Sequence, residues 1–379
     1  MTAVPKAPQK PLKGVRVVDF STLLPGPMAT LLLVEAGAEV IKIERPGTGE
    51  DMRQYPPMLT ADTGVNFALL NRGKRSLAAD LKNINELNKI KELIKNSHVL
   101  VEQFRPGVMA RLGLGYEDLK KINPALVYCS ITGYGQTGPK ASVAAHDLNY
   151  IAEAGLLGLG ADATGAPVLP PALIADIAGG TYPAVISILM ALREAEQTGE
   201  GAHLDIAMAD NMFAFMYWAL GELEVLGKDP AAGGELVTGG SPRYQIYRCA
   251  DSRYMAAAPL EPKFWANFCR VIDLPEALRD DGTDPDATKA AITQIIAGRS
   301  SAEWESAFDG VDACVAIVRT LSEAAADPHF QERGLFQGTM PVGDKTVTPL
   351  PVPIAPIYRD PDGGAVPPAL GEMNSDGEI

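Results

Sequence analysis

The sequence predicts an α/β fold, with a first domain built on a parallel sheet covered by helices and a second, smaller α+β domain. Short apolar runs alternate with helical stretches from Val15 to about Asp210, the pattern of parallel strands joined by helices. The composition then shifts to DPAAGGELVTGGSP between Leu226 and Gly240, which indicates a flexible connection between domains. A length of 379 residues suits two unequal domains.

Each element of the first domain is justified by a local pattern. VRVVDF predicts a strand, a Pro/Gly turn follows at 25–27, MATLLLVEAGA predicts a helix, and AEVIKIE predicts the second strand. The same alternation of strands and helices continues. SLAADL predicts a strand, the charged stretch through Ile94 a helix, HVLVEQF a strand, YEDLKKI a helix and LVYCSITGYG a strand.

The rest of the chain has a less regular pattern. Residues 174–194 are strongly helical, and AHLDIAMAD is either a strand or the entry to a helix. After the connection, YQIYRCADSRYMAAA and helical segments to about Leu321 predict the small α+β domain. The last stretch, from Thr339, contains too many prolines for helices and is expected to run extended over the surface.

The net charge of −14 is unevenly distributed. Residues 1–150 hold 19 Lys+Arg against 14 Asp+Glu, which is +5, whereas residues 151–379 hold 14 against 33, which is −19. Ligands of parallel α/β sheets gather outside the carboxyl ends of the strands, where cations could meet an anionic ligand. Any single one of these cations is best interpreted as solvated surface charge, but their clustering in an acidic chain favours a phosphate-bearing ligand. Few aromatic residues lie among them, so no nucleic-acid partner is predicted. The clustered cations are Lys42, Arg45, Arg72, Lys74, Arg75, Lys82, Arg105 and Arg111.

Several other classes are disfavoured by the sequence. The four cysteines are scattered, so neither a zinc site nor a disulfide framework is predicted and a reducing cytoplasm is expected. No apolar run of membrane-spanning length is apparent, so no membrane partner is predicted. The opening MTAVPKAPQKPLKG is interpreted as a disordered leader, and the closing DGEI matches no targeting address. The turn DFSTLLPGPMA lacks the glycines of a dinucleotide site.

His146 is the histidine that stands out as a candidate acid/base group. It lies in AAHDLNY, directly before Asp147, and a catalytic and a structural role are equally consistent with that position. The other three histidines are interpreted as structural: His98, His203 and His329.

Two acidic residues have unusual sequence surroundings. Asp176 lies in the apolar phrase LPPALIADIAGG, where it is either an N-cap or a buried carboxyl suited to proton transfer. Gly179 and Gly180 would let another group approach closely. Glu261, in PLEPKFW, is an ordinary turn carboxylate unless the fold brings it to a site.

Three methionines recur at four-residue spacing along AMADNMFAFMYW. On a helix, Met208, Met212 and Met216 would share one face. Plain core packing is the favoured interpretation, with an adaptable surface for an acyl chain as the alternative.

Several motifs, in the same order along the chain, resemble the family III CoA-transferase superfamily over essentially the whole sequence. Within it, the phrases HDLNY, ADIAGG and ADSRYMAAAPLEPKFW are similar to the α-methylacyl-CoA racemase branch. The motifs that carry the superfamily resemblance are VVDFSTLLPGPMA, GAEVIKIERPG, NRGKRSLAADLK, FRPGVMARLGLGYEDL, YCSITGYGQTGP and PALGE.

The resemblance implies a doubly wound, Rossmann-like large domain and an interlocked homodimer. The large, CoA-binding domain would comprise residues 1–225, completed by 325–379, and the linker and small domain 226–324. Coenzyme A would be part of the acyl-CoA substrate, with no other cofactor and no metal. The residues that the resemblance assigns to coenzyme A are Arg45, Ala79, Leu81, Lys82, Arg105, Arg111 and Tyr150.

The resemblance also implies a reaction. His146 and Asp176 would be two bases that invert the α-carbon of a 2-methylacyl-CoA through an enolate, in lipid metabolism. The backbone amide of Asp147 would stabilise the enolate oxygen, and Glu261 would orient His146. The alternatives are a CoA-transferase in which Asp176 attacks the thioester, and a non-catalytic acyl-CoA binder.

The sequence departs from the racemase pattern at three positions. Ala145, Ala175 and Ala178 stand where that pattern usually has glycine. The added methyl groups are expected to tighten the pocket and so to affect the choice of acyl chain.

Overall fold

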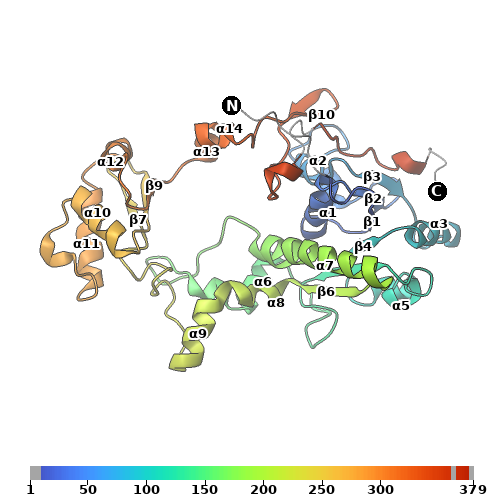
Figure 1. Ribbon diagram of the computed structural model, residues 1–379, viewed down its shortest axis with the longest axis horizontal. Coiled ribbons are helices and arrows are strands. Elements are labelled where there is room, and N and C mark those ends of the chain that lie inside the picture. The colour runs from blue at the N-terminus through green and yellow to red at the C-terminus, as the bar shows by residue number, and fades with distance from the viewer. Residues whose placement is uncertain (1–9, 360–363, 375–379) are drawn as a thin grey trace. The chain divides into compact units, whose positions relative to one another are not determined.

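The computed structural model describes residues 10–359 and 364–374, which divide into two compact units (Figure 1). The first unit comprises residues up to Ala154, Pro171–Phe215 and Pro328 onward, and the second Gly155–Pro170 and Met216–Asp327. The first boundary of the second unit, at 215/216, lies ten residues before the predicted boundary at 225/226, and its last boundary, at 327/328, lies three residues after the predicted one at 324/325. The second unit also includes Gly155–Pro170, which were predicted to belong to the large domain. Most of the predicted leader and the closing DGEI lie outside the described residues.

A six-stranded sheet forms the centre of the first unit, and every pair of neighbouring strands is parallel. The strand order is β3-β2-β1-β4-β5-β6, which is the doubly wound order with its reversal between β1 and β4. The α/β prediction is therefore confirmed for this unit. The strands are β1 (Arg16–Asp19), β2 (Glu39–Glu44), β3 (Arg75–Ala78), β4 (Val99–Glu102), β5 (Val127–Thr132) and β6 (His203–Ala207).

In α1 and α3, the residues that are buried are those that the hydrophobic pattern of each sequence predicts. α1 has proline in its first turn and is buried on nearly every side, as its apolar sequence requires. α3 is capped by the Asn83 side chain and buries one face, consisting of Leu87, Ile90 and Ile94. The helices are α1 (Pro25–Glu35), α2 (Val65–Asn71), α3 (Ile84–Lys95), α4 (Val108–Arg111), α5 (Tyr116–Leu119), α6 (Asp147–Glu153), α7 (Tyr182–Thr198) and α8 (Met208–Asn211).

The helical stretch predicted from Ile174 begins with a π-helical segment, Ala175–Thr181, which continues directly into α7. The combined helix Ala175–Thr198 is long and apolar enough to cross a membrane by length and composition, and 44% of its apolar 18-residue stretch is buried inside the protein. The expectation that no run reaches that length is therefore wrong. Its apolar side chains have a local explanation, because α7 packs against α1, β5 and β6.

The second unit contains a three-stranded antiparallel sheet in the order β7-β8-β9 and several helices. Its core is rich in aromatic side chains, and Phe268 stacks between Trp265 and Phe308. The elements are α9 (Tyr217–Leu226), β7 (Gln245–Arg248), β8 (Tyr254–Ala257), α10 (Pro262–Val271), α11 (Pro285–Ile296), α12 (Ser301–Phe308), β9 (Val315–Ile317) and α13 (Leu321–Ala326).

The C-terminal part of the chain returns to the first unit. α14 (Pro328–Glu332) precedes a short antiparallel hairpin of β10 (Met340–Val342) and β11 (Lys345–Val347). Beyond the hairpin the described chain is extended except for 3₁₀ turns at Pro356–Tyr358 and Glu372–Asn374. As predicted, residues 348–355 and 364–369 contain no helix, and they belong to no strand either.

Candidate active site

A cavity of about 400 Å³ lies at the point where the strand order of the sheet reverses. Its walls include Thr22 and Leu23 beyond β1, Gln103 and Arg105 beyond β4, and Tyr134 beyond β5. Open α/β sheets bind their ligands outside the carboxyl ends of the strands at such a reversal. The position of this cavity makes it the candidate active site.

His146 lines this cavity from the start of α6. The residue is exposed, and its backbone N–H donates to Asn149 Oδ1 at 3.1 Å. The Tyr150 hydroxyl donates to the backbone oxygen of Ala145 at 2.7 Å, which fixes the chain just before the histidine. The imidazole is therefore presented to the cavity by an anchored turn, with Ala145 and Tyr150 also in the lining.

Asp176 lines the same cavity from the first turn of the π-helical segment. Because the N-cap of that segment is Ile174, the N-cap interpretation of Asp176 is wrong. Burial, followed by the nearby charge of Asp147, raises the pKa of the Asp176 carboxyl to about 7. A carboxyl with such a pKa can both release and accept a proton near neutral pH.

Asp147 connects the two candidate groups. It is the first residue of α6, and its buried carboxylate Oδ1 accepts the backbone N–H of Asp176 at 2.9 Å. Its own N–H lies at the first helical position, where a helix offers no internal acceptor. The sequence pointed only to the amide of Asp147, and its carboxylate was missed because Asp176 is 29 residues away.

The two glycines after Asp176, Gly179 and Gly180, allow Met208 to pack closely against this segment. A Cβ atom on Gly179 would lie 2.4 Å from the backbone oxygen of Met208, and one on Gly180 would lie 3.1 Å from the Met208 sulfur. Met208, Met212 and Met216 are all buried, and they belong to α8 and a 3₁₀ turn, Met212–Met216. Core packing therefore accounts for Met212 and Met216, and Met208 also lines the cavity.

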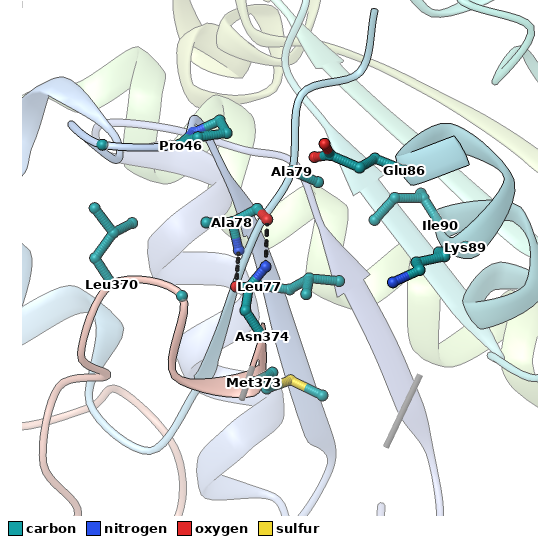
Figure 2. A pocket seen from close by; sticks show the side chains of 12 residues that line it. Pro46, Leu77, Ala78, Ala79, Glu86, Lys89, Ile90, Leu370, Met373 and Asn374 are labelled. Carbon is teal, nitrogen blue, oxygen red and sulfur yellow. Dashed lines mark hydrogen bonds between the residues drawn. The ribbon is translucent and has the colours of Figure 1, made fainter. Parts of the chain in front are cut away.

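A second cavity, of about 720 Å³, lies beside the ends of β2 and β3 (Figure 2). Ala79 lines it, and Leu81 and Lys82 follow in the chain, half-buried and exposed. Arg45 precedes the lining residues Pro46 and Gly47; its exposed side chain pairs with Asp51.

The other residues assigned to coenzyme A are divided between places in the first unit. Arg105 and Tyr150 line the first cavity. Arg111 ends α4, is exposed, and belongs to the lining of neither cavity.

Three of the predicted ligand-facing cations are buried in ion pairs. Lys42 Nζ lies 2.6 Å from Glu50, Arg72 Nη2 lies 2.7 Å from Glu35, and Lys74 Nζ lies 3.2 Å from Asp19. None of the three cationic side chains is more than 4% exposed. Their clustering at strand ends therefore reflects internal charge pairing. For Lys42, Arg72 and Lys74 the interpretation as solvated surface charge is wrong, and so is that of a cation facing a ligand.

Glu261 occupies the N-cap position of α10 in the second unit and is exposed. Its action on His146 stays a prediction. Among the remaining histidines, His98 accepts the backbone N–H of Arg16 at 3.1 Å, and His203 stacks on Tyr116. His329 lies in α14.

Two residues beside the first cavity were missed by sequence reasoning. Gln103 accepts the Gly26 N–H at 2.9 Å through its side-chain oxygen, which ties the start of α1 to the end of β4. Glu102 is 3% exposed, and burial raises the pKa of its carboxyl to about 7. Neither has a motif, although an acid ending an apolar strand is an unusual feature in HVLVEQF.

The comparisons with known proteins agree with this geometry. CoA-transferase family III matches residues 12–374. The chain is 35% identical to human alpha-methylacyl-CoA racemase over 90% of this chain and 86% of that protein. It is 34% identical to acetyl-CoA:oxalate CoA-transferase of Acetobacter aceti, over 98% and 96%. A CAIB/BAIF family protein from Brucella suis superposes with a TM-score of 0.82 at 27% identity, over 97% and 98%. The chain therefore belongs to CoA-transferase family III.

Proposed function

We propose that this protein is an acyl-CoA racemase or epimerase that inverts the α-carbon of a 2-methylacyl-CoA. One base, in its deprotonated form, removes the α-proton and leaves an enolate whose charge lies mainly on the thioester oxygen. The second base, in its protonated form, returns a proton to the opposite face of the carbon. His146 and Asp176 are the two bases, and they exchange protonation states in each turnover.

The observation that carries this proposal is that His146 and Asp176 line one cavity. A carboxyl with a pKa of about 7 suits proton exchange with an imidazole, the side chain that ordinarily titrates near neutral pH. The Asp147 amide would donate to the enolate oxygen, where negative charge develops. In this proposal no metal or redox cofactor takes part, and coenzyme A is the part of the substrate by which the enzyme binds it.

A CoA-transferase is the second candidate, because relatives with either activity are similar to this chain at nearly equal identity. Asp176 would then attack the thioester carbonyl, releasing the CoA thiolate and forming a mixed anhydride. The thiolate would attack the aspartyl carbonyl of that anhydride and displace the donor carboxylate, which leaves an aspartyl-CoA thioester. The presence of His146 in the cavity favours the racemase, since this transfer sequence needs no second base.

Proton exchange in heavy water tests the proposal. A single enantiomer of a 2-methylacyl-CoA is incubated with the enzyme in ²H₂O without an acceptor acid, and the α-proton is followed by NMR. Racemisation with deuterium incorporation is expected. No exchange, together with movement of CoA when a carboxylic acid is added, would establish the transferase instead. Neither reaction in the presence of tight CoA binding would indicate a non-catalytic binder.

Variants of the two bases sharpen the test. His146→Ala and Asp176→Ala are each expected to lower the racemisation rate by at least about 100-fold, because each removes one proton-transfer group. His98→Ala is the matched control, since His98 accepts a backbone hydrogen bond from Arg16 and lies outside the cavity lining. Wild-type activity in either base variant would refute the two-base assignment.

The proposal extends to a homodimer in the cytoplasm, without membrane or nucleic-acid partners. Exposed apolar side chains on α7 and on α9 support self-association, including Met190 at 68% and Tyr217 at 77% exposure. The four free cysteines agree with a reducing compartment. Light scattering at the enzyme's working concentration would detect the dimer, and a monomeric mass would contradict it.

A further inference from the structure

Leu23 has a backbone conformation that leucine rarely adopts. Its φ is +64°, in the left-handed region, where the Cβ atom of an L-residue comes too close to the following carbonyl oxygen. Three other described non-glycine residues have a positive φ, Ser252, Asp273 and Cys314, and all three belong to the second unit. Glycine would adopt this conformation without strain, so a leucine at position 23 indicates that its side chain is needed.

The turn around Leu23 is held on both sides by buried lysines. Lys42 Nζ donates to the backbone oxygen of Ser21 at 2.8 Å, and Lys74 Nζ donates to that of Pro27 at 3.0 Å. Both lysine side chains are buried, and the proposed reaction uses neither of them. Because the chain is fixed before and after Leu23, the turn cannot relax out of its strained conformation by a local adjustment.

The same turn packs against the segment that carries Asp176. Thr181 Oγ1 donates to the backbone oxygen of Pro25 at 2.8 Å. Leu23 and Ile177, the residue after Asp176, pack against one hydrophobic cluster. Leu23 and Asp176 both line the 400 Å³ cavity. The turn therefore brings an apolar side chain to the wall of the cavity that contains the two proposed bases.

The Leu23 side chain has two surroundings. It is half-buried, because it packs against the hydrophobic cluster and also lines the cavity. In the proposed reaction His146 and Asp176 act on opposite faces of the α-carbon, so a wall beside them limits the groups that this carbon can carry. An apolar wall selects by size, and one methylene group changes affinity by about tenfold or more.

We propose that Leu23 is a specificity-determining residue, which limits the smaller substituent of the α-carbon to a methyl group. The left-handed backbone places the leucine side chain at the cavity wall, where it occupies the volume that a longer substituent would need. This inference rests on the proposed function, because it takes the α-carbon to lie between His146 and Asp176. It narrows the substrate class to 2-methyl thioesters and excludes those with a 2-ethyl or larger branch.

Calorimetry with two racemic thioesters of the same main chain, a 2-methylacyl-CoA and a 2-ethylacyl-CoA, tests the proposal. The wild type is expected to bind the 2-methyl compound at least about tenfold more tightly. Leu23→Ala opens the wall, so the two Kd values are expected to come within about twofold of each other. Leu23→Met keeps a side chain of similar volume and is expected to keep the wild-type preference.

Leu24→Ala is the matched control. Leu24 adjoins Leu23, is half-buried and packs against the same cluster, but it does not belong to the lining of the cavity. Leu24→Ala is expected to keep the wild-type ratio of the two Kd values. An equal change of the ratio in both alanine variants would mean that lost packing, and not the cavity wall, sets the preference, which would overturn the proposal.

Glycine variants test the backbone strain separately. Glycine usually destabilises a protein relative to alanine, but the order reverses where φ is positive. Leu23→Gly is therefore expected to unfold at a higher urea concentration than Leu23→Ala. Leu24 has a φ of −117°, so Leu24→Gly is expected to unfold at a lower urea concentration than Leu24→Ala. The usual order at position 23 would overturn the argument that the leucine is kept there against strain.

The outcomes separate this inference from the proposed function. If the wild type does not discriminate between the two thioesters, or if Leu23→Ala keeps the wild-type preference, Leu23 does not set specificity and the proposed function is unaffected. If the wild type binds both thioesters without exchanging their α-protons, the proposed reaction fails and the Kd ratios still decide the inference. If the wild type binds neither thioester, both are overturned.

Discussion

Asp147 acts on Asp176 in two ways: its carboxylate holds the backbone of Asp176 in place, and its charge raises the pKa of the Asp176 carboxyl. The Asp147 carboxylate accepts the Asp176 N–H at 2.9 Å, and its charge adds to the effect of burial on the pKa of Asp176. The anchoring needs only a hydrogen-bond acceptor, whereas the perturbation needs the negative charge. A substitution that keeps the acceptor and removes the charge separates these two contributions.

Asp147→Asn is that substitution. Removing a neighbouring negative charge makes ionisation of Asp176 easier, so its pKa falls from about 7. The limb of the pH profile of kcat/KM that reports Asp176 is expected to move to lower pH by about one pH unit. Asp118→Asn, on the exposed surface of α5, is the control and leaves the profile in place. An unmoved limb in Asp147→Asn would contradict the assignment of that limb to Asp176.

Residue-scale features were also the hardest to predict from sequence. Lys42 and Arg45 stand three positions apart in KIERPG, yet Lys42 is buried against Glu50 while Arg45 is exposed. Lys42 lies inside β2, whose residues from Val40 to Glu44 are all buried, whereas Arg45 lies just beyond the end of the strand. The end of the strand and the position of the charge partner therefore decide which of the two is buried. That partner belongs to a loop whose course depends on the whole fold.

At the scale of elements, the π-helical segment and α8 pack closely enough to require glycine. A Cβ atom on Gly179 would lie 2.4 Å from a backbone oxygen, whereas on Gly180 its contacts at 3.0–3.1 Å are to side chains of Pro25 and Met208. Backbone cannot yield without moving α8, but a methionine side chain can adjust. A larger side chain should therefore be tolerated better at position 180 than at position 179.

Gly179→Ala and Gly180→Ala test this difference as a matched pair. Gly179→Ala is expected to lower the free energy of unfolding by about 2–3 kcal/mol and to reduce kcat, because the displaced segment carries Asp176. Gly180→Ala is expected to cost less than about 1 kcal/mol. Urea denaturation and the exchange assay provide the two readouts. Equal effects of both substitutions would show that the close approach does not hold Asp176 in place.

The elements themselves were largely predictable, because their patterns are local. The runs VRVVDF, AEVIKIE, HVLVEQF and LVYCSITGYG each contain a strand, and the alternation with helices predicted parallel pairing. The four-residue methionine spacing misled, since α8 ends at Asn211 and a 3₁₀ turn follows. The α-helix ends where α8 packs against the π-helical segment, a contact that no local sequence pattern reveals.

At the scale of the whole molecule, the basic N-terminal part of the chain contributes most of both cavities. The cations that line them, Lys89 and Arg105, lie within the first 150 residues, the stretch with the charge of +5. The remaining −19 belongs to residues 151–379, which include the whole second unit. The charge of −14 therefore leaves an anionic ligand possible, because local charge at a site steers binding more than the total does.

Buried acids also shape how stability depends on pH. Burial raises the pKa of Glu102 from 4.5 to about 7, while its Oε2 accepts the Phe104 N–H at 2.7 Å. Since the folded protein holds this proton more tightly than the unfolded chain, the contribution to stability is complete below pH 4.5 and is lost as pH rises through about 7. The shift of Asp176 acts with the same sign.

Glu102→Gln isolates this contribution, because glutamine resembles the protonated acid, can accept the same N–H and cannot ionise. At pH 8 the variant is expected to be more stable than wild type by up to about 3 kcal/mol, and at pH 4 the two should unfold at nearly equal urea concentrations. The exposed Glu200→Gln serves as control and should show no such difference at either pH. A constant difference between Glu102→Gln and wild type across this range would mean that Glu102 keeps its ordinary pKa, and that burial at the end of β4 does not hold its proton.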